Sequence, residues 1–335
     1  MINHTPTAAH HPISLVDVLR ARKRIAPYIR RTPLIESAWL SAAAGCRISL
    51  KLESLQVSSS FKARGAFNAV LARREERDAL STRLVTASAG NHGRALALAA
   101  ERSGWPLVVF TPRDAPRTKL DAIGRHGAVL RAEGRDYDDA EQMAKTFAES
   151  TGAAFISPYS DLDVIAGAGT IAPEIFDEAS DVDTLVVPIG GGGLISGVAA
   201  ATRRINPGCR IIGVEVAASC PFQTSLRAGR LVPIVPGPTL ADGLAGNPDP
   251  ETITFAFVQQ YVDEIVTVSE PELATSIVEL AAHEHLIAEG AGAVGIAALL
   301  AGHVTSAKGH VATIVTGSNI DSQQLIHVLA STSRG

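Results

Sequence analysis

The sequence predicts an α/β protein with two open parallel sheets, each lying between layers of helices in a three-layer arrangement. Two observations carry this prediction. Short apolar runs of strand length alternate with longer segments in which apolar residues recur at helical spacing. The alternation occurs twice in the 335-residue chain, between residues 84 and 156 and again between residues 185 and 315. Strands that alternate with helices form parallel sheets, so each series predicts a sheet of its own.

Composition narrows the class of function. With 46% hydrophobic and 19% charged residues, the chain resembles a soluble globular enzyme. A net charge of −4 and an aromatic content of 4% argue against nucleic-acid binding. No apolar run is long enough to cross a membrane, and residues 1–13 lack the apolar core of a signal peptide. Three cysteines without CxxC spacing argue against a disulfide framework, so we expect a cytoplasmic protein whose partner is a small molecule.

The N-terminal segment is predicted to form a helix, a strand and a second helix. Ser14 and Asp17 resemble a capping box, which would begin a helix over residues 14–29. Residues 47–53 alternate apolar and polar side chains, as a half-buried strand does. A polar loop follows, and the second helix begins at Ala63.

The two alternating series then predict the remaining elements. The first series contains strands at 84–87, 107–110, 128–130 and 153–156, with helices at 91–103, 115–126 and 136–150. The second contains strands at 185–189, 211–214, 265–268 and 311–315, with helices at 194–205, 270–286 and 291–301. Residues 233–250 are rich in proline and glycine and are predicted to be a long functional loop.

These elements suggest two domains. If the N-terminal segment packs with the second sheet, residues 73–156 form a smaller inserted α/β domain. Residues 1–72 and 157–335 then form the larger domain. The cleft between them is the expected active site.

Lys62 lies in the first candidate site, between a polar loop of serines and a predicted helix. A lysine acts as a nucleophile or base when a partly desolvated pocket lowers the pKa of its ammonium group. Phe61 and the serines before it could form such a pocket. An ordinary lysine at the start of a helix is the alternative.

Two glycine-containing turns between a strand and a helix predict anion sites. The run at residues 190–193 would expose backbone N–H groups at a helix start, where a phosphate can bind. It is not a dinucleotide fingerprint, because Ile195 stands where that motif needs glycine. Residues 88–93 repeat the arrangement and suit a carboxylate. His92, within this turn, is either an acid–base group or a positioning residue.

A lysine, a phosphate site, a carboxylate site and a hydroxyl from Thr316 at the end of the last strand are together what a pyridoxal 5′-phosphate enzyme acting on an amino acid needs. The ordered motifs also resemble those of the serine/threonine dehydratase and serine racemase family, the fold type II (tryptophan synthase β-like) pyridoxal enzymes. The resemblance runs from about Leu15 to Leu329. The motifs are SFKARGA at 60–66, SAGNH at 88–92, AGAGT at 166–170, GGGG at 190–193, ADGL at 241–244 and TGSN at 316–319.

The resemblance implies a role for each motif. Lys62 would hold the cofactor as a Schiff base in the larger domain and act as the base at the substrate Cα, and Asn91 would contact the cofactor 3′-oxygen. The other implied cofactor-binding residues are Phe61, Gly190, Gly191, Gly192, Gly193, Leu194 and Thr316. The implied substrate-binding residues are Ser88, Ala89, Gly90, Asn91, His92 and Tyr159. The resemblance also suggests a homodimer.

Three departures from the family pattern sharpen the expectation. Ala89 stands where the racemases carry a second serine base, which disfavours racemisation. Tyr159 stands where threonine dehydratases have an aromatic residue and racemases an asparagine. Glu215 matches one ligand of the family's divalent-metal site, but Pro221 replaces the acidic partner, so we expect no metal and keep Glu215 only as a weak candidate.

The sequence therefore predicts a pyridoxal-phosphate-dependent dehydratase, or ammonia-lyase, of a β-hydroxy amino acid such as L-threonine or L-serine. Its products would be a 2-oxo acid and ammonia. Alternatives are a related dehydratase for 3-hydroxyaspartate, phenylserine or a hydroxyectoine-derived amino acid, or a serine racemase. A non-catalytic metabolite-binding protein that uses only the glycine loop is the alternative from a different class.

Overall fold

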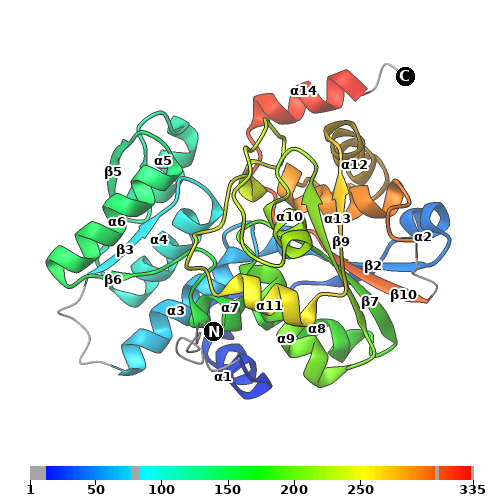
Figure 1. Ribbon diagram of the computed structural model, residues 1–335, viewed down its shortest axis with the longest axis horizontal. Coiled ribbons are helices and arrows are strands. Elements are labelled where there is room, and N and C mark those ends of the chain that lie inside the picture. Colours follow the sequence, from blue (N-terminus) through cyan, green and yellow to red (C-terminus); the bar gives the residue numbers. More distant parts are fainter. Residues whose placement is uncertain (1–12, 77–82, 306–308, 333–335) are drawn as a thin grey trace, which may run out of the picture.

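The computed structural model describes residues 13–76, 83–305 and 309–332, and the predictions made for residues 1–12 fall outside them. Two separate sheets organise the described chain, one of six strands and one of four (Figure 1). The predicted α/β class with parallel sheets is confirmed. No helix in these ranges is long and apolar enough to cross a membrane.

The larger sheet has one antiparallel edge. Its strand order is β1 (Leu34–Glu36), β2 (Arg47–Lys51), β10 (His310–Ile314), β7 (Val182–Pro188), β8 (Arg210–Val216) and β9 (Glu264–Val268). All neighbours pair in parallel except β1 and β2. The antiparallel β1 was not predicted, because a strand of three residues is too short to show a period of two.

Helices cover both faces of the larger sheet, as the three-layer prediction requires. One apolar cluster joins the sheet to helices on one face: α1 (Leu15–Ile25), α7 (Leu162–Gly169), α8 (Ile171–Glu178), α9 (Gly193–Ile205) and α11 (Thr254–Tyr261). A second cluster joins it to helices on the other face: α2 (Ala38–Ala44), α12 (Glu270–His283), α13 (Gly290–Leu300) and α14 (Ser322–Thr332). A further short helix, α10 (Pro221–Ala228), follows β8.

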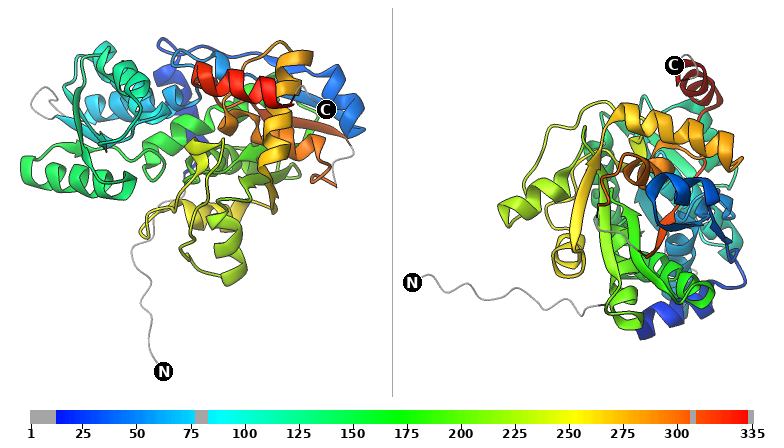
Figure 2. Two further views of the ribbon diagram at one scale, coloured as in Figure 1. Left: turned by 90° about the horizontal axis from the view of Figure 1, so that it is seen from above. Right: turned by 90° about the vertical axis from the view of Figure 1, so that its right-hand side faces the viewer.

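The smaller sheet lies at one end of the molecule, well separated from the larger one (Figure 2, left). Its parallel strands are, in spatial order, β5 (Val129–Gly134), β4 (Leu107–Pro112), β3 (Leu84–Ala87) and β6 (Ala154–Phe155). Helix α6 (Tyr137–Thr151) packs on one face. Helices α4 (Asn91–Ser103) and α3 (Lys62–Glu76) pack on the other, with α5 (Arg117–Gly124) beside α4.

Helix α3 joins the two sheets because it packs against both α4 and α7. The α3–α7 contact is backbone to backbone: a Cβ on Gly167 would lie 2.5 Å from the Arg64 carbonyl oxygen, and one on Gly65 would lie 2.7 Å from that of Val164. This close approach requires both glycines and fixes the start of α3. The helix continues past residue 72, so the proposed domain boundary falls inside it and stays a prediction.

The predicted elements largely coincide with the observed ones, and the missed ones share a cause. The capping box of Ser14 and Asp17 is present, although α1 ends at Ile25 rather than near residue 29. Helices α2, α7, α8, α10, α11 and α14 were not predicted. In α7 the consecutive residues 164–169 are all buried, so the segment lacks the polar face that makes a helical period visible.

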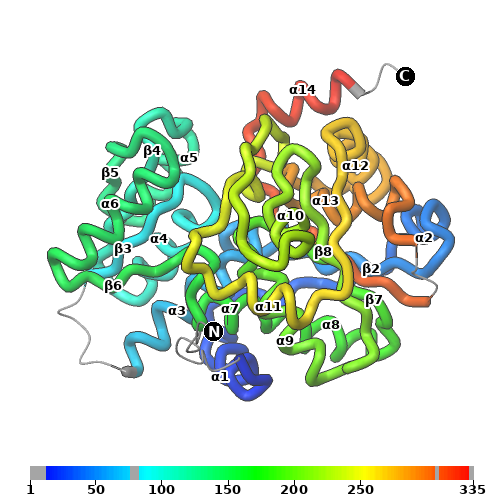
Figure 3. Tube along the Cα trace, viewed as in Figure 1, coloured from blue at the N-terminus to red at the C-terminus, as the bar shows by residue number. Residues whose placement is uncertain are grey.

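The loop over residues 233–250 contains only a single 3-10 turn, Asp242–Leu244, as predicted for a segment without its own core. Figure 3 shows it as the yellow-green trace on the side of the larger unit that faces the smaller one. Two ion pairs tie it there, Lys119 with Asp242 and Lys145 with Asp249. The loop therefore spans the junction of the two sheets.

Candidate active site

Lys62 is the first residue of α3, and its side chain is partly buried. Its Nζ donates a 2.8 Å hydrogen bond to the Pro158 carbonyl oxygen and lies 5.1 Å from the centre of the Phe61 ring. Burial lowers the pKa of the Lys62 ammonium group to about 8, an effect that the negative charge of Glu289 partly opposes. The shift increases the fraction of neutral amine near neutral pH, which is the direction that a nucleophilic lysine needs.

The lowered pKa predicts how the cofactor-free protein reacts. Because the neutral amine is the nucleophile, modification of Lys62 should accelerate as the pH rises through about 8 and level off above it. An ordinary lysine in a model peptide has a pKa of about 10.4 and provides the reference. Mass spectrometry of the Lys62 peptide after timed acylation measures the midpoint. A midpoint equal to that of the model peptide would contradict a desolvated amine.

The loop that leads into Lys62, called the lysine loop below, is held to the end of β10. Phe61 N–H donates to the Thr316 carbonyl oxygen at 2.9 Å, and Ser318 N–H donates to the Ser59 carbonyl oxygen at 2.9 Å. Ser59 adopts a φ of 58°, which is uncommon for a residue with a side chain and belongs to the tight turn before Lys62. Parallel sheets place ligands at the carboxyl ends of their strands, and this pairing brings the lysine there.

The glycine run at residues 190–193 presents backbone N–H groups that are available to a ligand. None of the N–H groups of residues 190–195 donates a hydrogen bond to another described residue. Gly192 has a φ of 86° and caps α9, and side chains would not fit on its neighbours: a Cβ on Gly191 would lie 2.3 Å from the Tyr159 ring, and one on Gly193 2.9 Å from the Tyr159 Cα. Unpaired N–H groups at a helix start suit a phosphate, as predicted for Gly190 to Leu194.

The second predicted anion site lies at the start of α4. Gly90 N–H donates to the Ser88 hydroxyl at 3.2 Å, whereas the N–H groups of the next three residues donate to no described residue. A Cβ on Gly93 would lie 2.5 Å from the Ser88 carbonyl oxygen, so this turn folds tightly over the end of β3. Ala89 is partly exposed and Gly90 exposed, so the turn is open to a small ligand.

His92 is almost fully buried at 3% exposure. Burial, and secondarily the positive charge of Lys62, lower the pKa of its imidazole to about 3. The ring is therefore neutral at physiological pH. Of the two interpretations of His92, a positioning role agrees better with this environment than a charged acid does.

Thr316 lies at the end of β10 and is 3% exposed. Its hydroxyl donates to the Ala291 carbonyl oxygen at 3.1 Å. Because a hydroxyl has one hydrogen, donation to a cofactor nitrogen would require Thr316 to release this bond. The backbone pairing described above places Thr316 next to Phe61.

Tyr159 packs its ring against the glycine run, and its hydroxyl accepts the Asp249 N–H at 2.9 Å. Burial raises the pKa of the phenol well above its usual value, so the ring stays neutral. Asp249 in turn pairs with Lys145 of α6. Tyr159 thus connects the glycine run to the long loop and to the smaller unit.

Glu215 has a structural role that the sequence did not reveal. Its carboxylate accepts the N–H groups of Phe222 and Gln223 at 2.9 and 2.8 Å and so caps the start of α10. Burial raises its pKa to about 7 although these two bonds oppose the shift. The described residues contain no cluster of three potential metal ligands.

A buried charge network adjoins the lysine loop. Arg64, two residues after Lys62 and 0% exposed, pairs with Glu53 at 2.7 Å and with Glu174 at 2.8 Å. Lys51, also 0% exposed, pairs with Glu174 at 2.8 Å. Thr32 donates its hydroxyl to Glu53 at 2.5 Å. Ionised groups out of water persist only when paired in this way, so the network ties α3 to β2 and α8.

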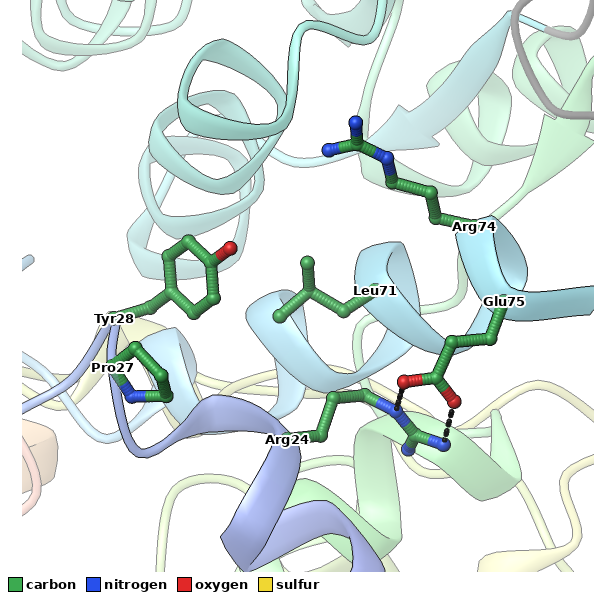
Figure 4. Close-up of a pocket in the computed structure, with 6 residues that line it drawn as sticks. All are labelled: Arg24, Pro27, Tyr28, Leu71, Arg74 and Glu75. Atoms are coloured by element: carbon green, nitrogen blue, oxygen red, sulfur yellow. Dashed lines mark hydrogen bonds and ion pairs between the residues drawn. The ribbon is translucent and has the colours of Figure 1, made fainter.

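A separate surface pocket of about 450 Å³ lies between α1 and α3 (Figure 4). Its lining residues are Arg24, Pro27, Tyr28, Leu71, Arg74 and Glu75. Arg24 pairs with Glu75 across it. Leu71 is nine residues beyond Lys62, or about 14 Å along the helix at 1.5 Å per residue, so this pocket is distinct from the lysine site.

These residues fit pyridoxal 5′-phosphate. The free N–H groups of residues 190–195 can bind a phosphate, and the side-chain-free surface of the glycines leaves room for it. The lowered pKa of Lys62 suits reaction of its amine with an aldehyde. Ser60 and Ser196 near these two features have buried hydroxyls with no partner among the described residues.

Sequence reasoning missed Arg94 and also Glu289, the acceptor of the Asn91 amide. The Asn91 amide donates to Glu289 at 2.6 Å, and the two residues are 198 positions apart. The only local signal was an isolated acid among small residues, in Ala288-Glu289-Gly290, before a wholly apolar helix. An acid in that setting is exposed or functional, and only the fold distinguishes the two.

Known proteins are similar to this chain in sequence and in fold. A profile of the family described as pyridoxal-phosphate dependent enzyme matches residues 25–317. An L-threonine ammonia-lyase of Thermotoga maritima is 42% identical over 95% of this chain and 78% of its own. An L-threo-3-hydroxyaspartate ammonia-lyase of Saccharomyces cerevisiae is 37% identical over 95% and 97%. The solved structure of maize serine racemase has a TM-score of 0.88 at 31% identity, over 96% and 98% of the two chains.

Proposed function

The chain belongs to the pyridoxal-phosphate dependent enzyme family, and we propose that within it the protein is a dehydratase, or ammonia-lyase, of a β-hydroxy amino acid. L-Threonine and L-serine are the proposed substrates, and the products are a 2-oxo acid and ammonia. The observation that carries the proposal is the desolvated Lys62 amine, with unpaired N–H groups at the helix starts of α9 and α4. The ammonia-lyase relatives support the same class of reaction.

The cofactor, when bound, supplies an electron-withdrawing system that acidifies the substrate Cα–H bond. The chain's own residues bind the cofactor and the substrate and move the Cα proton. The N–H groups of residues 190–195 hold the phosphate, and those at the start of α4 hold the substrate carboxylate. The Lys62 amine accepts the Cα proton, for which its lowered pKa is suited. The neutral His92 keeps a second positive charge out of this pocket.

A substrate panel tests the proposal. Purified holoenzyme is offered L-threonine, L-serine, L-threo-3-hydroxyaspartate, phenylserine and hydroxyectoine-derived amino acids, and the 2-oxo acid is quantified. The proposal requires the highest kcat/KM for L-threonine or L-serine. Preference for 3-hydroxyaspartate would instead establish the second candidate, which the yeast relative supports. Cofactor binding without turnover of any of them would contradict a dehydratase.

The turn at Ala89 predicts the stereochemical outcome. Inversion at Cα needs a group that can return a proton to the face opposite Lys62, and a methyl side chain cannot do so. Chiral chromatography after long incubation with L-serine should therefore show pyruvate and no appreciable D-serine. The matched variant Ala89→Ser adds a hydroxyl at the same backbone position and should begin to form D-serine. Substantial D-serine from the unaltered protein would overturn this account.

Location and assembly are further parts of the proposal. All three cysteines, Cys46, Cys209 and Cys220, are free thiols, which supports a reducing compartment such as the cytoplasm. The proposed homodimer is supported by the family resemblance of the sequence. Light scattering of the holoenzyme measures it directly.

A further inference from the structure

A directional chain of hydrogen bonds crosses the junction of the two sheets at the lysine pocket. Arg94, on α4, donates to the Asn319 side-chain oxygen. Asn319 donates to the Asn91 side-chain oxygen at 2.6 Å, and Asn91 donates to Glu289 at 2.6 Å. Asn319 also donates to the Ser58 carbonyl oxygen at 3.0 Å, in the lysine loop. Each amide is held at both its oxygen and its nitrogen, so neither can flip without losing bonds.

This series of hydrogen bonds leaves one N–H of the Asn91 amide without an acceptor among the described residues. An amide nitrogen carries two hydrogens, and Glu289 accepts only one of them. Because Asn319 occupies the amide oxygen, Asn91 offers an N–H rather than a carbonyl to any ligand of the pocket. Glu289, the last acceptor in the series, therefore fixes the orientation of the Asn91 amide nitrogen.

Glu289 is placed for this contact rather than for capping its own helix. It is the N-cap residue of α13, yet its side chain makes no cap hydrogen bond. The carboxylate instead packs on Gly317, where a Cβ would lie 2.1 Å from Glu289 Oε1. Its backbone N–H donates to the Gly317 carbonyl oxygen at 3.0 Å, and Gly317 pairs with Ser60 in the lysine loop. The carboxylate is thus fixed between the loop that carries Lys62 and the helix that carries Asn91.

Glu289 also faces several charged groups. Its side chain is buried, which raises its pKa to about 7. Asp242 of the long loop acts in the same direction, whereas the Asn91 hydrogen bond, Lys119 of α5 and Arg94 of α4 oppose it. Its negative charge in turn raises the pKa of Lys62 against the effect of burial. From α4, His92 also faces Lys62 and is neutral.

We propose that Glu289 is a positioning residue of the active site, with two separable effects. Through its hydrogen bond it orients the Asn91 N–H that binds the cofactor, and through its negative charge, fixed beside the loop that carries Lys62, it acts on the Lys62 amine. The cofactor part rests on the proposed function. Neither effect depends on which amino acid is the substrate, so a wrong substrate assignment would leave both measurements intact.

Three variants separate the two effects. Glu289→Gln keeps an oxygen acceptor for Asn91 but removes the charge. Asn319→Ala keeps the charge but frees the other side of the Asn91 amide. Glu289→Ala removes both contributions of Glu289. Glu272→Gln, a carboxylate in the first turn of the neighbouring α12, is the matched control.

The readouts are the dissociation constant of the cofactor, by equilibrium dialysis, and the pH midpoint for modification of Lys62 in the cofactor-free protein. Glu289→Ala should weaken cofactor binding about ten- to hundredfold, because Asn91 then loses the acceptor that fixes the orientation of its amide. It should also lower the midpoint. Glu289→Gln should lower the midpoint with little loss of affinity, and Asn319→Ala should weaken binding without moving the midpoint. The control should change neither.

The proposal is overturned if Glu289→Ala binds the cofactor as tightly as the unaltered protein, or if Glu289→Gln leaves the Lys62 midpoint unchanged. Circular dichroism establishes that each variant is folded. If Glu289→Ala does not fold, Asn319→Ala and Glu289→Gln still decide the two parts independently. Parallel losses of both quantities in all variants, the control included, would indicate general destabilisation and also overturn it.

Discussion

Replacing Lys62 by alanine is expected to abolish the dehydratase reaction. The variant loses the amine that accepts the Cα proton, and acid–base assistance of this kind contributes about 10²–10⁴-fold to rate. It also loses the group that reacts with the cofactor aldehyde, so the total loss should exceed that range. Turnover of L-threonine, measured as 2-oxo acid, and the visible absorbance of lysine-bound cofactor should disappear together.

Two controls make the Lys62 result specific. Lys23→Ala removes an exposed lysine of α1 and should retain both turnover and absorbance. Adding a small primary amine to Lys62→Ala should restore a measurable part of the turnover, because the cavity left by the side chain can admit a soluble base. Full turnover by Lys62→Ala without added amine would exclude Lys62 as the base.

The second large effect is expected on stability rather than on chemistry. Arg64→Leu leaves the buried carboxylate of Glu174 paired with Lys51 and that of Glu53 with no cation among the described residues. Removing one partner of a buried ion network typically costs about 3–5 kcal/mol, since the remaining charges are neither solvated nor paired. Denaturant unfolding of the cofactor-free protein should show this loss in the transition that includes the larger sheet.

An exposed ion pair provides the comparison for Arg64. Arg47 pairs with Glu36 at 2.8 Å and with Asp181 at 2.9 Å, and about half of each side chain is exposed. Arg47→Leu should change the free energy of unfolding by about 1 kcal/mol or less, because water screens exposed pairs. If Arg64→Leu were no more destabilising than Arg47→Leu, the buried network would not be what anchors the start of α3.

Local features account for what could be predicted. Some features depend on only a few neighbouring residues, so the sequence itself shows them. They are the glycines between a strand and a helix, the lysine at a helix start and the capping box. The turn at residues 88–93 and the run at residues 190–193 lie at helix starts as expected. The roles of Lys62, Asn91 and Thr316 toward the cofactor stay predictions, to be tested by the variants above.

What the sequence alone determined is therefore the α/β class and the positions of the loops that carry chemistry, because strand–helix alternation and turn chemistry are set by near neighbours. The tertiary structure decided the rest. Asn91 meets Glu289 across 198 positions, and Arg64 meets Glu174 across 110. Such contacts exist only once the helices α3, α4, α8 and α13 are packed around the two sheets. Burial in that packing is also what shifts the pKa of Lys62, and no pattern of neighbouring residues encodes it.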